Sequence, residues 1–265
     1  MPSPRWVDTH AHLTHSRLVD RVAEILATAA AEGVIRIVSA ATCAEDALAV
    51  TELATNSSIV RAAVGIHPND THLAAPGDWD RIVALTENRH VVAIGETGLD
   101  KYWKDAPFDV QLDFFARHLD LAERLGLPVV IHCRDAMPEI LEFLETRNRP
   151  VKGTLHCFTG TLPDAQRLMA LGLHLGFGGI CTFRNKDSDT FAELIRAVPE
   201  DRILVETDAP FLSPHPFRGK TNEPARVAVV GRFIAELRGW PEDKCSEITT
   251  QNALALFADR IDGSP

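Results

Sequence analysis

The amino-acid sequence predicts an α/β fold of the (β/α)8 or TIM-barrel class, in which eight parallel strands alternate with helices. Short apolar segments typical of buried parallel strands alternate with longer helical patterns along the whole chain. Eight such strand–helix units can be counted, which is the number that closes a barrel. No linker or change in composition divides the 265 residues. We therefore expect a single domain over residues 1–265, with an open doubly wound sheet as the alternative fold.

Each expected strand is a short apolar run that ends at a polar or glycine-containing turn. The strands are Arg5–His10, Val34–Ala40, Ile59–Ile66, Val91–Gly95, Pro128–His132, Lys152–His156, His174–Gly178 and Arg202–Thr207. Helices are indicated by apolar residues three and four positions apart and by a glycine where the pattern stops. The helices are Arg17–Glu32, Ala44–Thr55, Trp79–Glu87, Asp109–Leu125, Met137–Thr146, Pro163–Leu171, Asp189–Val198 and Pro224–Leu237, with an extra C-terminal helix near Glu242–Phe257.

The composition is that of an ordinary soluble globular protein, with 45% hydrophobic and 24% charged residues. The formal net charge of −10 argues against a broad basic surface that binds nucleic acid backbone non-specifically. It leaves room for an acidic pocket in which bound metal ions meet a phosphate. The sequence has no apolar run of membrane-spanning length, no secretory signal and no CxxC pair among its five cysteines. We expect a cytoplasmic protein that does not bind membranes.

Polar side chains recur at the C-terminal ends of the expected strands, where a barrel of this class carries its chemistry. Imidazoles and carboxylates are costly there unless they are paired or bound to metal. They lie at the ends of six strands and are His10, His12, His67, Glu96, His132, His156, Glu206 and Asp208. His10 and His12 point to the same side of an extended strand, because successive side chains alternate. Four histidines with two carboxylates suit two divalent ions, which typically clamp a phosphoryl group.

Seven motifs resemble, in order, those of the TatD-type metal-dependent deoxyribonucleases, a family of amidohydrolase-like barrels. The motifs are Asp8-Thr9-His10-Ala11-His12, Gly65-Ile66-His67-Pro68, Gly95-Glu96-Thr97-Gly98-Leu99-Asp100, Ile131-His132-Cys133-Arg134, His156-Cys157-Phe158-Thr159-Gly160, Glu206-Thr207-Asp208-Ala209-Pro210 and Arg218-Gly219-Lys220-x-Asn222-Glu223-Pro224. The resemblance implies one ion held by His10, His12 and Asp208 and a second ion held by His132 and His156. Glu96 stands between the ions, where related binuclear barrels carry a carbamylated lysine. Sharing an ion between His12 and Asp208 requires the first and eighth strands to be neighbours.

The resemblance implies a hydrolase that cleaves phosphodiester bonds of DNA, in single strands or at ends, through a hydroxide bound to two divalent ions (Mg, Mn or Zn). Asp208, Glu96 and His67 are the expected catalytic residues. Asn69 stands where relatives often carry a histidine, and Lys101 where an aromatic residue is common; both departures lie beside the site, where they concern contacts to the substrate and not the metal ligands. One alternative is a C–N or ester hydrolase acting on a small molecule, since this fold supports many chemistries. Another is a metal-dependent binding protein without catalysis.

Several residues near the expected site have two interpretations. Arg218 follows the eighth strand, at the usual phosphate-binding corner, and either grips phosphate or pairs with Glu223. Arg134 is a second candidate phosphate contact. Asp8 and Glu206 either orient metal ligands or form internal ion pairs. Trp103 and Phe183 either stack on a base or pack within the protein. Residues expected to be core or surface only are Cys133, Cys157, His15, His72, His90, His118, His174 and His215.

Overall fold

Eight parallel strands follow one another around a ring, each hydrogen-bonded to the next along the chain. The computed structural model describes residues 4–184 and 188–259. The strands are β1 (Trp6–Ala11), β2 (Val34–Ala40), β3 (Val60–Val64), β4 (Val91–Asp100), β5 (Val129–Arg134), β6 (Gly153–Leu155), β7 (Leu173–Phe177) and β8 (Ile203–Val205). The ring closes just after β8, where Ala209 forms a parallel bridge with Ala11 and the Asp208 N–H donates to the His10 carbonyl at 2.9 Å. The predicted (β/α)8 barrel is confirmed, and the alternative open sheet is wrong.

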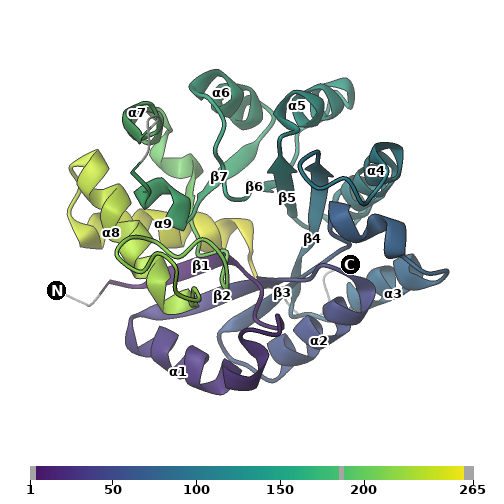
Figure 1. Ribbon diagram of the computed structural model, residues 1–265, viewed down its shortest axis with the longest axis horizontal. Coiled ribbons are helices and arrows are strands. Elements are labelled where there is room, and N and C mark those ends of the chain that lie inside the picture. Colours follow the sequence, from purple (N-terminus) through teal and green to yellow (C-terminus); the bar gives the residue numbers. More distant parts are fainter. Residues whose placement is uncertain (1–3, 185–187, 260–265) are drawn as a thin grey trace.

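Helices follow the strands and form a layer outside the ring, as Figure 1 shows. The α-helices are α1 (Val22–Ala31), α2 (Ala44–Thr55), α3 (Asp78–Leu85), α4 (Phe108–Leu125), α5 (Met137–Thr146), α6 (Leu162–Ala170), α7 (Ser188–Ala197), α8 (Val227–Arg238) and α9 (Glu242–Leu256). Short 3-10 helices are η1 (Val19–Arg21), η2 (Pro68–Leu73), η3 (Gly179–Thr182), η4 (Glu200–Arg202) and η5 (Pro224–Arg226). Within the described ranges, no helix combines the length and apolar character needed to cross a membrane.

The extra C-terminal helix, α9, packs against the N-terminal ends of β1 and β8. The hydroxyls of Ser246 and Thr250 both donate to the Arg5 carbonyl, at 2.7 and 2.6 Å. The Asn252 side chain donates to the Ile203 carbonyl at 2.9 Å. Helix α9 therefore holds together the first and last strands at the end of the barrel opposite to the predicted site.

Strand alternation divides the core into a layer inside the ring and a layer between strands and helices. Val7, Val38 and Val130 belong to a compact inner cluster. Trp6, the neighbour of Val7, is buried in the outer layer and lies against α8. A methyl group at Gly231 would come within 2.1 Å of the Trp6 ring, so this helix approaches the strand closely only because it carries a glycine there.

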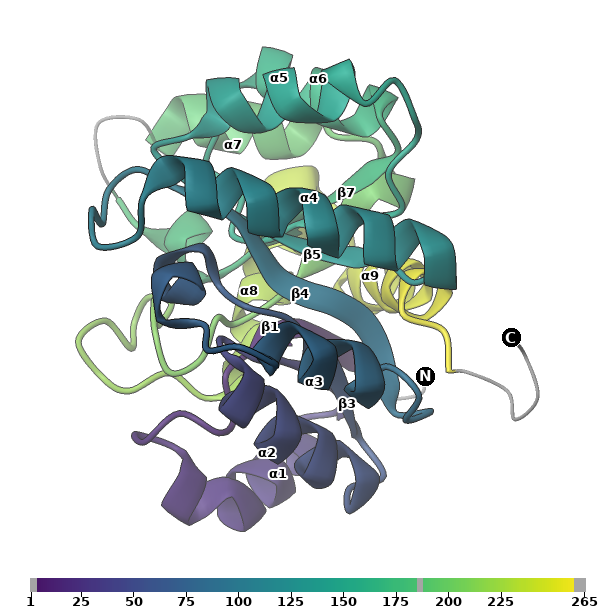
Figure 2. The same ribbon diagram turned by 90° about the vertical axis from the view of Figure 1, so that its right-hand side faces the viewer.

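The difference from the predicted elements that matters most for the site is in β4, which continues to Asp100 instead of ending at Gly95. Glycines usually weaken a strand, but here they allow two backbones to approach. A methyl group at Gly98 would lie 2.0 Å from the His132 carbonyl oxygen. Gly98 is paired with His132 and Asp100 with Arg134, so β4 stays parallel to β5 throughout this segment. Figure 2 shows the long β4 with α4 lying over it.

Candidate metal centre

Six polar side chains converge where the strands end, and they come from five places around the ring. His10 lies near the end of β1 and His12 just after it, so alternation turns both rings to the same side. Their Nε2 atoms are 3.1 Å apart. Glu96 lies in β4, His132 in β5, His156 directly after β6 and Asp208 shortly after β8. The structure thus brings together all six residues that the sequence predicts as metal ligands.

Glu96 stands at the centre of this cluster and is 1% exposed. Its Oε1 lies 2.8 Å from His156 Nε2 and 3.0 Å from His132 Nδ1. Its Oε2 lies 3.3 Å from His10 Nε2 and 3.4 Å from His12 Nε2. Burial acts to raise the pKa of Glu96, but the charges of His156 and His10 outweigh it and hold the pKa well below its usual value. Each oxygen of one ionised carboxylate therefore faces a different pair of imidazoles.

Asp208 supplies the second carboxylate of the cluster. Its Oδ1 lies 3.5 Å from His12 Nε2 and 3.8 Å from His10 Nε2. Burial acts to raise the pKa of Asp208, but the hydrogen bond with His12 and the charge of His10 lower it below the usual value. Burial likewise acts to lower the pKa of His12, yet Asp208 and Glu96 together raise it to about 9. The proximity of His12 and Asp208 agrees with the closed barrel.

Two further carboxylates lie behind the imidazoles of His132 and His156. Asp100 Oδ2 lies 3.0 Å from His132 Nε2, which leaves Nδ1 toward Glu96. Burial acts to raise the pKa of Asp100, but the hydrogen bond with His132 lowers it to about 2. Glu206 Oε1 lies 3.5 Å from His156 Nδ1 and accepts the Cys157 N–H at 2.6 Å. Such partners fix the tautomer and orientation of metal-binding histidines.

Asp8 acts on the backbone instead of on an imidazole. It accepts hydrogen bonds from the Thr207 N–H and hydroxyl, at 2.9 and 2.6 Å, and from the His10 N–H at 3.4 Å. Burial raises its pKa to about 8, against these hydrogen bonds. Asp8 thus joins β1 to the segment after β8. Of the two carboxylates predicted to orient ligands, only Glu206 lies against a ligand ring.

The donor set fits a divalent metal ion. Three overlapping trios have their donor atoms within 4.8 Å of one another: His10, Glu96 and His156; His10, His12 and Asp208; and His67, Glu96 and His132. Glu96 Oε2 and His10 Nδ1 are buried and have no hydrogen-bond partner among the described residues. Buried polar atoms are costly unless they are satisfied, and a cation satisfies a carboxylate oxygen surrounded by imidazoles. The imidazole donors suit zinc, and the carboxylate donors suit zinc or a harder ion such as manganese.

His67 borders the cluster with its imidazole held in the neutral form. Its Nδ1 accepts the Asn69 N–H at 3.1 Å, so the ring hydrogen is on Nε2, which lies 3.6 Å from Glu96 Oε1. Burial and the charge of His132 lower the pKa of His67 to about 3, which keeps the ring neutral. His67 therefore presents an N–H to the site, and this geometry favours a hydrogen-bond donor over a metal ligand.

The two arginines predicted to contact the substrate lie on the same rim, each over an aromatic ring. The Arg134 guanidinium is 3.8 Å from the Tyr102 ring centre, and that of Arg218 is 3.5 Å from the Phe183 ring centre. The suggested pair between Arg218 and Glu223 is wrong, since Glu223 is paired with Arg21 at 3.3 Å.

Asp100 is the functional residue that the sequence reasoning missed. Ending the fourth strand at Gly95 hid it, whereas a strand continued to Asp100 turns its side chain to the same side as Glu96. Asn69, noted as a departure from the family pattern, donates to Asp100 Oδ2 at 3.1 Å and so supports the same carboxylate. Lys101, the other departure, is paired with Glu139 at 2.5 Å.

The remaining candidates agree with a structural role. Cys133 packs against the core, and burial raises its pKa to about 12, which is unsuitable for a nucleophile. Cys157 lies beyond the end of β6 and has a φ of 48°. The direction of its side chain therefore does not follow from strand alternation. His118 is fully buried and receives the Ile66 N–H on Nε2 at 2.9 Å.

Comparison with known proteins extends over almost the full length of the chain. Residues 7–258 match the family model described as TatD related DNase. The uncharacterized metal-dependent hydrolase YabD of Bacillus subtilis is 39% identical over 251 residues, covering 94% of this chain and 98% of the relative. The uncharacterized metal-dependent hydrolase YcfH of Escherichia coli K12 is 37% identical over 262 residues, covering 97% of each chain.

A solved structure gives the same result for the fold. The crystal structure of YJJV, a TatD homolog from Escherichia coli K12, superposes with a TM-score of 0.90 at 32% sequence identity, covering 97% of this chain and 99% of that one. The similarity includes the whole barrel and therefore every strand that contributes to the cluster. This chain belongs to the TatD family of metal-dependent hydrolases.

Proposed function

We propose that this protein hydrolyses phosphodiester bonds of DNA at a centre of two divalent ions. The observation that carries the proposal is the arrangement around Glu96, whose two oxygens face separate imidazole pairs. A carboxylate in this position suits a bridge between two ions, and paired ions are typical of phosphodiester hydrolysis. The family description as TatD related DNase supports DNA as the substrate.

The protein's own residues have distinct tasks in this reaction. Divalent ions in the centre would lower the pKa of water and neutralise charge on the phosphate oxygens. Asp208, ionised and directed into the centre, accepts the proton of the attacking water. The Nε2–H of His67 donates to an oxygen of the scissile phosphate. Glu96 would hold the ions in place, and Arg134 and Arg218 bind flanking phosphates from the rim.

A second candidate is a C–N or ester hydrolase that acts on a small molecule. The net charge of −10 favours it, because a long polyanion is repelled by an acidic protein unless the contact is local. The two candidates differ in what the rim must contact: a small ester needs only the metal centre, whereas DNA extends beyond it.

One assay separates these functions. Protein stripped of metal and reloaded with magnesium, manganese or zinc is given labelled single-stranded DNA, double-stranded DNA and a panel of esters and lactones. We expect metal-dependent cleavage of DNA that disappears in Glu96→Ala and Asp208→Ala but persists in Asp113→Asn, a change on the exposed side of α4. Ester turnover with intact DNA would overturn the proposal. Tight metal binding without any turnover would indicate a binding protein.

We also propose that the protein works in the cytoplasm. All five cysteines are free thiols, which is usual in a reducing compartment. Fractionation of cells that express a tagged chain tests this proposal, and recovery of the protein outside the cytoplasm would contradict it.

A further inference from the structure

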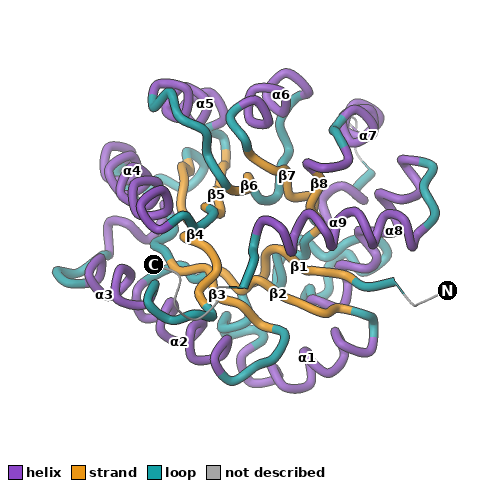
Figure 3. Tube along the Cα trace, turned by 180° about the vertical axis from the view of Figure 1, so that it is seen from behind, coloured by secondary structure: helices purple, strands orange, loops and turns teal. Residues whose placement is uncertain are grey.

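Gln111 is a buried amide on α4 that ties this helix to the end of β4. It lies near the start of α4 and is 2% exposed. Its Oε1 accepts the Asp100 N–H at 2.8 Å, and its Nε2 donates to the carbonyls of Asp100 at 3.0 Å and Ala106 at 3.1 Å. A buried amide is costly unless its donors and acceptor are satisfied, and here they all have backbone partners. Figure 3 shows α4 outside β4 and β5, so the side chain reaches the barrel from the outer layer.

The end of β4 needs such a partner because it extends beyond its neighbour β3. The last pair between these two strands joins Val64 to Ile94, whereas β4 continues along β5 as far as Asp100. The N–H and C=O of one strand residue point to the same side, and the next residue points to the other side. The Lys101 N–H donates to the Arg134 carbonyl in β5 at 2.9 Å, so the backbone of Asp100 faces the side where β3 has ended. The side-chain amide from α4 takes the place of a strand there.

Asp100 in turn holds a predicted metal ligand. Its Oδ2 lies 3.0 Å from His132 Nε2, and the Asn69 side chain donates to the same oxygen at 3.1 Å. His132 directs its other nitrogen, Nδ1, to Glu96 at 3.0 Å. Because the aspartate side chain is short, a shift of its backbone would move the carboxylate away from the imidazole. Gln111, Asp100 and His132 thus form a continuous chain of contacts from the outer helix layer to the centre.

We propose that Gln111 is a positioning residue of the metal centre. Through the backbone of Asp100 it fixes the carboxylate that orients His132, and it thereby sets the affinity of the centre for one of its ions. This inference rests on the metal centre of the proposed function and is independent of which substrate is hydrolysed. Loss of a partner behind a metal-binding histidine usually weakens metal binding by about 10- to 100-fold, and Gln111 acts one contact further away.

A purely structural role for Gln111 would give a different result. Without the amide, the backbone groups of Asp100 and the Ala106 carbonyl would lose a hydrogen-bond partner, which lowers the free energy of unfolding. A structural residue would lower stability and leave the metal affinity of the folded protein unchanged. The metal affinity is therefore the deciding measurement.

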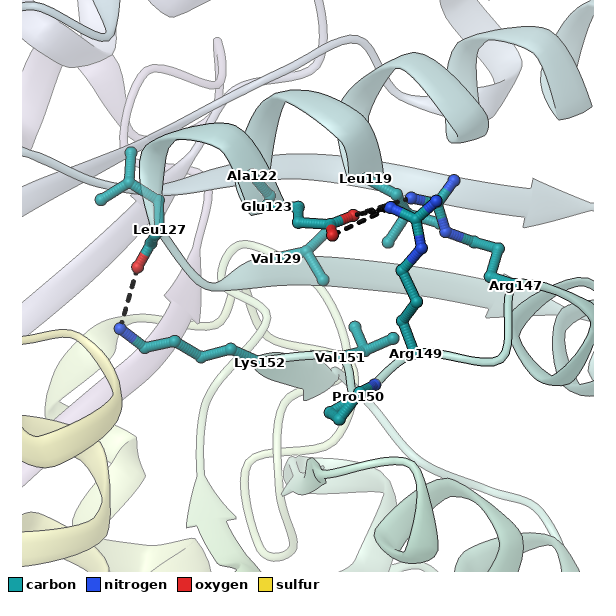
Figure 4. A pocket seen from close by; sticks show the side chains of 11 residues that line it. Leu119, Ala122, Glu123, Leu127, Val129, Arg147, Arg149, Pro150, Val151 and Lys152 are labelled. Atoms are coloured by element: carbon teal, nitrogen blue, oxygen red, sulfur yellow. Dashed lines mark hydrogen bonds and ion pairs between the residues drawn. The ribbon is translucent and has the colours of Figure 1, made fainter.

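The other end of α4 supplies a matched control. Figure 4 shows a cavity of about 200 Å³ there, lined by Leu119 and by Glu123, which is paired with Arg149 at 2.8 Å. Leu119 is 4% exposed, so Leu119→Ala removes buried packing from the same helix without touching the contacts of Asp100. It should lower the free energy of unfolding and leave metal binding unchanged.

The test measures manganese binding to the metal-stripped protein by calorimetric titration, with folding of each variant checked by circular dichroism. Gln111→Met removes all three hydrogen bonds with little change in volume. We expect it to bind one ion roughly 3- to 10-fold more weakly than the wild-type protein, a smaller loss than that of Asp100→Asn. Gln111→Glu should lose less than Gln111→Met, because burial favours the protonated acid, which accepts from Asp100 and donates to one carbonyl.

A double variant shows whether Gln111 acts through Asp100. In the Asp100→Asn background, Gln111→Met should weaken metal binding no further. If Gln111→Met does not fold, Gln111→Glu carries the same comparison in both backgrounds. Wild-type affinity of the Gln111 variants would overturn the positioning role, and so would an equal loss in both backgrounds or in Leu119→Ala. Absence of metal binding by the wild-type protein would overturn the proposed centre as well, whereas metal binding without DNA cleavage would overturn only the proposed function.

Discussion

At the scale of single residues, the most informative feature is that three imidazoles of the centre each lie against a second group that faces away from it. His132 and Asp100, His156 and Glu206, and His67 with the Asn69 N–H form three such pairs. The first two leave a nitrogen lone pair for a cation, whereas the third presents an N–H. The chemistry of the centre therefore depends on neighbours of the ligands as much as on the ligands.

Replacing Asp100 tests this dependence. Asp100→Asn keeps the size of the side chain but removes the charge that holds His132 Nε2. We expect the affinity for one of two ions to fall by about 10- to 100-fold, as is usual when such a partner is lost. Calorimetric titration of the metal-stripped protein with manganese measures it. Asp113→Asn serves as a control, and equal affinities in both variants would contradict the role of Asp100.

At the scale of elements, packing outweighs local propensity in α8. Helix propensity alone predicts that Gly231→Ala stabilises the helix by about 1 kcal/mol. The added methyl group would come within 2.1 Å of the buried Trp6 ring, however, and overpacking costs about 1–3 kcal/mol. We expect a net decrease in the free energy of unfolding, measured by urea denaturation. Arg232→Ala, on an exposed part of the same helix, should change it little, and stabilisation by Gly231→Ala would refute the argument.

Helix α4 is joined to the loop after β3 by His118, and this connection predicts a pH effect. Burial lowers the pKa of His118 to about 4, although its hydrogen bond to the Phe114 carbonyl opposes the shift. The unfolded chain takes up a proton near pH 6.5 and the folded chain only near pH 4. The contribution of His118 to stability is therefore present above pH 6.5 and is lost as the pH falls toward 4, by at most about 1.4 kcal/mol per pH unit.

The variant His118→Gln isolates this contribution. The difference in unfolding free energy between the wild-type protein and His118→Gln, measured in urea from pH 7 to pH 4.5, should decrease as the pH falls. Other titrating groups are common to both proteins and cancel in the difference. A difference that stays constant over this range would show that His118 is not buried in its neutral form.

At the scale of the whole molecule, the centre connects distant parts of the chain, so metal should stabilise the entire barrel. An ion at 100 times its dissociation constant adds about 2.7 kcal/mol to the free energy of unfolding. For a chain of this size that raises the midpoint of thermal unfolding by about 5–10 °C. Calorimetry with a chelator, or with added manganese or zinc, measures the shift. Glu96→Gln should lose most of it, and an unchanged midpoint in the wild-type protein would argue against the metal centre.

The sequence predicted the barrel and the convergence of the six ligands because both depend on periodic patterns along the chain. Alternation placed His10 and His12 on one side, and the shared end of parallel strands brought Glu96, His132 and Asp208 together. The sequence could not reveal contacts that depend on the distance between two backbones. The length of β4 follows from the close approach at Gly98, and the place of Arg218 over Phe183 follows from the meeting of two loops. Neither contact leaves a local signal in the sequence.

The closure of the ring between β1 and β8 has a consequence for synthesis of the protein. His10 and His12 leave the ribosome first among the ligands, and Asp208 leaves last, held to His10 by its backbone N–H. A nascent chain that ends before Asp208 lacks one carboxylate of the centre and the contact that completes the ring. The hydrolase therefore stays latent during translation, and its activity begins only when the barrel is complete.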